Sequence, residues 1–128
     1  VRSLDEDMRD LVQERLHQVA EGTAAANQCE ITIEYERGYP ITDNNEEATQ
    51  HAISVASSVS EVDTDTPPIM PSEDFAYMLM EKPGAFIFLG NGDSQMLHNP
   101  EYIFDDEAIP FGSSWYAGMV EERLPITG

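Results

Sequence analysis

The sequence predicts an α/β chain that contains several helices and at least two short strands. Apolar residues recur at helical spacing at the start of the chain, which predicts an amphipathic helix over about residues 4–21. Apolar and polar residues then alternate strictly over 29–36, as they do in a strand with one face in water. The continuous apolar run 85–89 lies between two glycines and predicts a strand buried on both faces. Helices combined with strands of both kinds are typical of layered α/β and α+β proteins.

The first helix and the first strand have recognisable ends. Ser3 and Glu6 have the spacing of a capping box, in which each side chain bonds a free backbone N–H of the first turn. Gly22 is the expected stop of this helix. Gly38 and Pro40 end the alternating strand, because proline lacks the N–H that a strand ladder needs.

The second helix is predicted to follow Asn44 or Asn45, since either amide can cap the first turn. Two glutamates come next, where the helix dipole favours negative charge. Its apolar face consists of small residues and is expected to pack closely against a neighbour: Ala48, Ala52, Val55, Ala56 and Val59. Residues 60–71 contain three prolines and predict a loop.

The last third of the chain predicts two more helices around the buried strand. Ser72 is expected to cap a short helix that ends near Met80. A polar loop follows the strand at residues 90–95. Asp105 is expected to cap a final helix that extends through Val120.

The charge balance excludes some classes of partner. The 128 residues contain 25 Asp and Glu against 6 Lys and Arg, a net charge of −19. Nucleic acid and anionic membrane surfaces both require a basic footprint, so neither is an expected partner. A solvated surface and a salt-adapted source both account for the acidity. The single cysteine, Cys29, cannot form an internal disulfide, and no apolar stretch is long enough to span a membrane. We therefore expect a cytoplasmic protein.

Two short segments contain residues that could take part in catalysis or binding. His98 follows the buried strand in a polar loop, where an imidazole can bind a divalent metal, act as a base, or be a simple polar loop residue. Glu73 and Asp74 lie at a helix start, where acids are favoured by the dipole and free N–H groups can bind an anionic substrate. No complete catalytic set is present, so no catalytic residue is assigned.

These segments resemble blocks of the metal-dependent amidohydrolases that include hippurate hydrolase, N-acyl-amino-acid deacetylases and indole-acetyl-amino-acid hydrolase. The resemblance covers essentially all 128 residues, in order. Its most specific blocks are Ser72-Glu73-Asp74-Phe75 and Leu97-His98-Asn99-Pro100. Similar blocks are Val1-Arg2-Ser3-Leu4-Asp5, the segment from Gly38 to Asn44, the segment from Pro83 to Gly92, and the continuation from Pro100 to Ile109.

The resemblance implies that the chain is the C-terminal portion of a zinc-peptidase-like enzyme. Residues 1–40 would be the last helix and strand of an α+β lid that mediates homodimers, and residues 41–128 the C-terminal part of the catalytic α/β domain. His98 corresponds to the last metal ligand of a centre with two divalent ions, zinc or manganese. Glu73, Asp74 and Asn44 match motif positions and would support the pocket or bind substrate.

The activity that the resemblance implies is hydrolysis of the amide bond of an N-acyl or N-aroyl amino acid by a metal-activated water. The remaining ligands and the general base belong to family segments that have no counterpart in these 128 residues. The isolated chain is therefore predicted to be inactive. The alternative is a truncated homologue that acts as a non-catalytic binding or dimerisation module.

Overall fold

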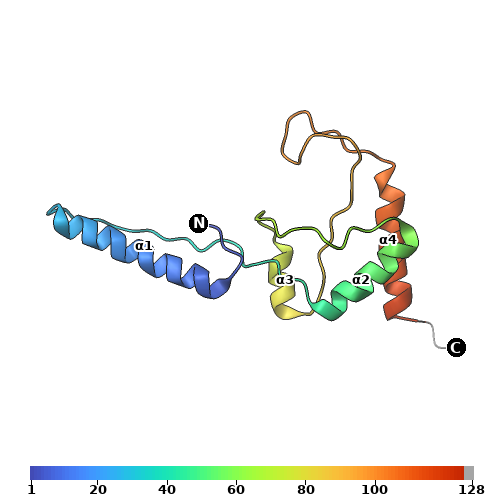
Figure 1. The fold of residues 1–128 in the computed structure, drawn as a ribbon, viewed down its shortest axis with the longest axis horizontal. Coiled ribbons are helices and arrows are strands. Elements are labelled where there is room, and N and C mark those ends of the chain that lie inside the picture. The colour runs from blue at the N-terminus through green and yellow to red at the C-terminus, as the bar shows by residue number, and fades with distance from the viewer. Residues whose placement is uncertain (126–128) are drawn as a thin grey trace. The chain divides into compact units, whose positions relative to one another are not determined.

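The computed structural model describes residues 1–125, and this part of the chain contains four helices (Figure 1). They are α1 (Glu6–Ala26), α2 (Glu46–Val59), α3 (Phe75–Glu81) and α4 (Ala108–Arg123). The chain divides into two compact units, the first made of residues 1–43 and 67–82 and the second of residues 44–66 and the chain from Pro83 onward. No helix in the described part is both long enough and apolar enough to cross a lipid bilayer.

The expected α/β fold class is wrong, because residues 1–125 form helices and connecting segments but no strand. Segments 29–36 and 85–89 do not pair with a second backbone, and a strand exists only where such a ladder forms. The neighbour of the first segment is α1, a helix whose own N–H and C=O groups bond to each other. The alternation of apolar and polar residues over 29–36 therefore did not ensure that a second strand would be available to pair with this segment.

Helix α1 begins and ends later than its sequence pattern predicted. The side chain of Asp5, not that of Ser3, caps the helix by accepting the N–H of Met8 at 2.6 Å. Gly22 does not stop the helix, which continues for another turn to Ala26. The chain leaves the helix at Gln28, whose φ of 53° is the left-handed conformation common after a helix end.

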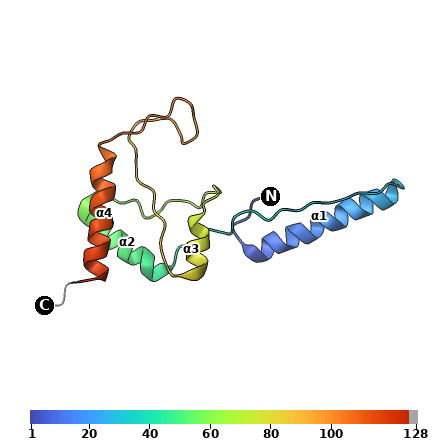
Figure 2. The ribbon, with the colours of Figure 1, turned by 180° about the vertical axis from the view of Figure 1, so that it is seen from behind.

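In the first unit, the segment after α1 runs back alongside that helix (Figures 1 and 2). Its side chains keep part of the predicted alternation, since Ile33 and Tyr35 are half-buried while Thr32 and Glu34 are exposed. The ring of Tyr35 lies 6.0 Å from that of His17 on α1. This segment thus lies against a helix and not against the second strand that a sheet would require.

Four charged residues, here called the Glu6 cluster, join the first turns of α1 to the end of this returning segment. Its ion pairs are Arg9 Nη1–Glu6 Oε1 at 3.1 Å, Arg37 Nη2–Glu6 Oε2 at 2.9 Å and Arg37 Nη1–Asp10 Oδ1 at 2.5 Å. The backbone N–H of Ile41 also donates to Glu6 Oε1 at 3.2 Å. Partial desolvation raises the pKa of Glu6, but the hydrogen bonds from Arg37, Arg9 and Ile41 outweigh it and hold that pKa below the ordinary value.

The Glu6 cluster is expected to make stability depend on pH in a defined window. Because the pKa of Glu6 is lower in the folded state, its contribution is fully present above the ordinary value of 4.5 and is lost as the pH falls through the folded value. Glu6→Gln should destabilise the chain at neutral pH by about 1 kcal/mol or less, since the pairs are exposed. Urea unfolding at neutral pH and at about pH 3 measures the difference in the free energy of unfolding between the unchanged chain and this variant.

The matched control for this prediction is Glu30→Gln, since Glu30 is exposed in the same unit and forms no ion pair in the described part. The difference between the unchanged chain and Glu6→Gln should shrink in acid, while Glu30→Gln has little effect at either pH. If Glu6→Gln loses as much unfolding free energy in acid as at neutral pH, the Glu6 cluster is not the source of the pH dependence.

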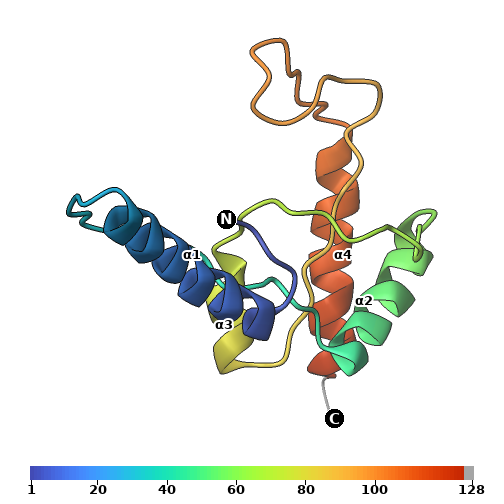
Figure 3. The same ribbon diagram turned by 60° about the vertical axis from the view of Figure 1, so that its left-hand side comes forward.

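In the second unit, α2 and α4 pack against each other (Figure 3). The helix predicted to follow Asn44 or Asn45 is confirmed, and of the two residues Asn45 is the cap. Its side chain accepts the N–H of Ala48 at 3.0 Å. The small-residue face of α2 is the contact surface, with Ala52 and Val55 buried. The indole N–H of Trp115 on α4 donates to the carbonyl of Ala52 at 3.1 Å.

The two remaining helices begin later than predicted. Helix α3 begins at Phe75 instead of after Ser72, and no side chain caps it. Helix α4 begins at Ala108, and Asp105 instead accepts the N–H of Glu107 at 3.0 Å in the turn just before it. Short polar side chains stabilise turns as well as helix caps. Ser72 and Asp105 therefore indicated that a helix was near but not the residue at which it begins.

Candidate functional site

His98 lies in the loop that connects segment 85–89 to α4. This loop extends beyond the N-terminal end of α4 in the second unit (Figures 1 and 3). His98 is exposed, and its φ of 68° lies in the left-handed region that costs a non-glycine residue about 1–2 kcal/mol. No hydrogen bond or ion pair occupies its imidazole in the described part of the chain, so both ring nitrogens are open to a ligand.

Asn44 connects the start of α2 to segment 85–89 through its side-chain amide. Its Nδ2 donates to the carbonyl of Phe86 at 2.9 Å, and its Oδ1 accepts the N–H of Phe86 at 2.7 Å. The backbone N–H of Asn45 donates to the carbonyl of Gly84 at 2.9 Å next to this pair. Asn44 thus bonds one residue of the predicted strand as a neighbouring strand would. This is a structural role, and the predicted pocket role stays a prediction.

Alanine in place of Asn44 is expected to destabilise the second unit by about 2 kcal/mol, because two hydrogen bonds are lost at about 1 kcal/mol each. The amide of Phe86 should then exchange with solvent faster, as measured by hydrogen–deuterium exchange. Gln50→Ala, an exposed change on α2, is the control and should leave both quantities nearly unchanged. Unaltered exchange at Phe86 in Asn44→Ala would exclude this connection.

Glu73 and Asp74 lie at the start of α3, in the first unit. Glu73 is half-buried and its Oε1 accepts the N–H of Phe75 at 3.3 Å. Asp74 is exposed, and its backbone carbonyl accepts the N–H of Tyr77 at 3.0 Å while its side chain caps nothing. Glu73 therefore stabilises the turn into the helix, and a binding role for either residue stays a prediction.

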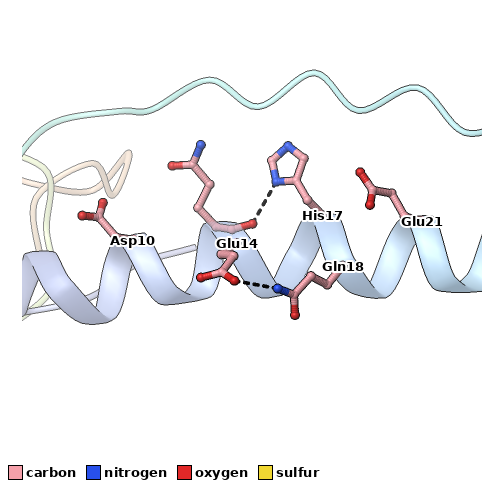
Figure 4. A pocket seen from close by; sticks show the side chains of 6 residues that line it. Asp10, Glu14, His17, Gln18 and Glu21 are labelled. Carbon is pink, nitrogen blue, oxygen red and sulfur yellow. Dashed lines mark hydrogen bonds between the residues drawn. The ribbon is translucent and has the colours of Figure 1, made fainter.

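A shallow groove of about 450 Å³ lies on α1 (Figure 4). It is lined by Asp10, Gln13, Glu14, His17, Gln18 and Glu21. Most of these groups already have partners: His17 Nδ1 lies 2.9 Å from the carbonyl of Gln13, and Gln18 donates to Glu14 at 2.6 Å. Asp10 belongs to the Glu6 cluster. The groove is therefore an open stretch of helix surface and not a candidate site.

The described residues do not form a complete metal centre. No three His, Cys, Asp or Glu side chains within residues 1–125 are grouped so that they could hold an ion. A catalytic zinc takes three protein ligands, so His98 fits one ligand position and no more.

The chain belongs to peptidase family M20/M25/M40, whose sequence model matches residues 6–122. The matched range covers α1, α2 and α3 in full and α4 as far as Glu122. It contains the predicted positions Asn44, Glu73, Asp74 and His98. This membership confirms the family that the sequence blocks indicated. Enzymes of this family are metal-dependent hydrolases.

Individual relatives agree with this membership. Over 127 residues the chain is 36% identical to a hippurate hydrolase of Campylobacter jejuni, and the aligned region covers 97% of this chain and 33% of the relative. It is 32% identical over 126 residues to an N-acetyldiaminopimelate deacetylase of Pediococcus pentosaceus, again with 97% and 33% covered. A deacetylase of the same name from Streptococcus suis is 34% identical over 113 residues, with 87% and 30% covered. No solved structure shows significant similarity to the chain.

The chain spans about a third of the length of the curated relatives that it matches. The activity, substrate and partners of a whole protein are therefore matters for proposal.

Proposed function

We propose that this chain is the C-terminal portion of a metal-dependent amidohydrolase that cleaves the amide bond of N-acyl or N-aroyl amino acids. The observation that carries the proposal is the similarity to hippurate hydrolase over 97% of the chain, in a range that includes the Leu97-His98 block. Hippurate and N-acetyldiaminopimelate, the substrates in the relatives' names, are both amino acids with an acylated nitrogen.

His98 is proposed as one ligand of a centre with two divalent ions, zinc or manganese. Its open imidazole on a loop tip is consistent with this role, because metal-binding histidines need a free ring nitrogen. Such ions supply a water that is acidic enough to be deprotonated near neutral pH. Glu73, Asp74 and Asn44 are proposed to support the pocket. The remaining metal ligands are expected in segments that correspond to the two thirds of each relative outside the matched region.

We also propose the domain assignment that the resemblance implies. Residues 1–40 are assigned to the lid, which forms the homodimer contact, and residues 41–128 to the catalytic domain. A cytoplasmic protein is proposed on the basis of the single cysteine, which cannot form an internal disulfide.

The test is a hybrid in which this chain replaces the matching third of the Campylobacter jejuni hippurate hydrolase. The hybrid is expected to release benzoate from hippurate and to lose this activity with a chelator. The 128-residue chain alone is expected to release none and to retain far fewer than two metal ions per chain, as measured by elemental analysis. A folded, metal-loaded hybrid without activity contradicts the proposal.

The gene sequence upstream of Val1 decides the case if the hybrid does not fold. In-frame segments with a metal-binding histidine motif and paired glutamates are expected. A stop codon or unrelated sequence there would instead support a non-catalytic binding or dimerisation module. Metal-dependent hydrolysis by the isolated chain would contradict its assignment as a portion of the active site.

A further inference from the structure

The loop that contains His98 is closed at its base by two polar side chains, Asn91 and Ser94. Asn91 Nδ2 donates to the carbonyl of Ile103 at 2.7 Å, and Asn91 Oδ1 accepts the N–H of Asp105 at 2.8 Å. Ser94 Oγ lies 2.9 Å from the carbonyl of Ile103 and accepts its N–H at 3.1 Å. These two side chains, here called the clasp, thus bond the backbone on the opposite side of the loop.

The hydrogen bonds of the clasp join the two sides of the loop, whereas the backbone hydrogen bonds nearer its tip join residues only three positions apart. Asn99 donates its N–H to the carbonyl of Met96 at 3.1 Å, and its own carbonyl accepts the N–H of Tyr102 at 2.9 Å. These bonds form two successive turns, and the first of them contains His98. Local turns shape the tip, but they do not determine where the tip lies relative to α4.

His98 occupies an unfavourable backbone conformation within these turns. A φ of 68° in a non-glycine residue persists only where the surrounding structure holds it. Both Asn91 and Ser94 are half-buried although their loop is otherwise mostly exposed, so water competes less with their bonds. The clasp therefore provides a restraint that the exposed tip residues cannot provide themselves.

We propose that Asn91 and Ser94 are positioning residues for His98: they close the loop and so hold the imidazole in one place at its tip. This inference rests on the proposed function for the use of His98, but the restraint itself is a property of these residues. Neither side chain touches a reacting group. They act through the backbone at Ile103 and Asp105.

The primary test measures backbone order at His98 in the 128-residue chain by NMR relaxation. The order parameter of the His98 N–H should be about 0.85, the value of rigid backbone. In the variants Asn91→Ala and Ser94→Ala it should fall below about 0.6, the range of flexible backbone. Ser94→Thr, which keeps the hydroxyl, should restore order. Asn27→Ala is the matched control, since the Asn27 amide bonds the carbonyl of Thr23 in the first unit.

A second measurement in the hybrid enzyme separates the clasp from the proposed function. Asn91→Ala should weaken zinc binding about 10–100-fold, as the loss of a residue that supports a ligand does, without a matching change in KM for hippurate. Order at His98 that is unchanged in both alanine variants, or that is absent in the unaltered chain, overturns the clasp. Undiminished zinc in His98→Ala overturns the proposed function while the relaxation result stands.

Discussion

Valine in place of Gly118 is expected to lower the free energy of unfolding of the chain by about 3 kcal/mol, near the upper end of what overpacking costs. Gly118 lies where α4 approaches α2, and a Cβ there would stand 2.7 Å from Cγ1 of Val55. Val55 is buried and branched at Cβ, so it cannot rotate away freely. The two helices must therefore separate. Urea unfolding followed by circular dichroism measures the loss.

Two further variants distinguish this contact from an ordinary helix effect. Gly22→Ala in α1 meets nothing within 4 Å and should stabilise the chain by about 1 kcal/mol through helix propensity alone. Val55→Ala in the Gly118→Val background should recover part of the loss, since it removes the atom that clashes. If Gly118→Val is as stable as the unaltered chain, α2 and α4 do not pack as closely as described.

Alanine in place of His98 is expected to cause the largest functional loss. In the hybrid with hippurate hydrolase, the loss of a metal ligand should exceed the about 10–100-fold that the loss of a supporting residue causes. Both bound zinc and benzoate release should fall, because an ion with fewer ligands dissociates more easily. Elemental analysis of the purified hybrid and a benzoate assay at saturating hippurate measure the two effects separately.

The controls are the other two histidines, which have structural partners. His17 lies beside Tyr35, and His51 Nδ1 is 2.6 Å from Glu122 Oε1 on α4. His17→Ala and His51→Ala should leave the zinc content unchanged, although His51→Ala removes the hydrogen bond to Glu122, worth about 1 kcal/mol. Equal loss of zinc in all three variants would show a general destabilisation and would remove the special role of His98.

The sequence alone predicted the helices well where their determinants are local. The second helix was predicted to follow Asn44 or Asn45, and it does follow Asn45, because its cap and its first bonds involve residues only three or four positions apart. The family was also predicted correctly, since short blocks such as Glu73-Asp74-Phe75 and Leu97-His98 are visible in the chain itself. Helix starts were missed by a few residues where Ser3, Ser72 and Asp105 do not act as caps.

Much of the candidate site could not be predicted, because its contacts join residues far apart in the sequence. Asn44 was singled out as a motif position, but its bonds to Phe86 join residues 42 positions apart. Asn91 and Ser94 stood in a loop that the sequence did predict, yet nothing local indicated that they bond Ile103.

The amino-acid sequence by itself determined the helices, the acidic surface and the family of this protein. Only the tertiary structure decided that segments 29–36 and 85–89 are not strands, that Gly118 must be small, and that the His98 loop is closed at its base. The physical reason is the range of the interactions. A helix satisfies its backbone with residues four positions away, whereas a strand, a close helix crossing and a closed loop each need a partner that the local sequence does not specify.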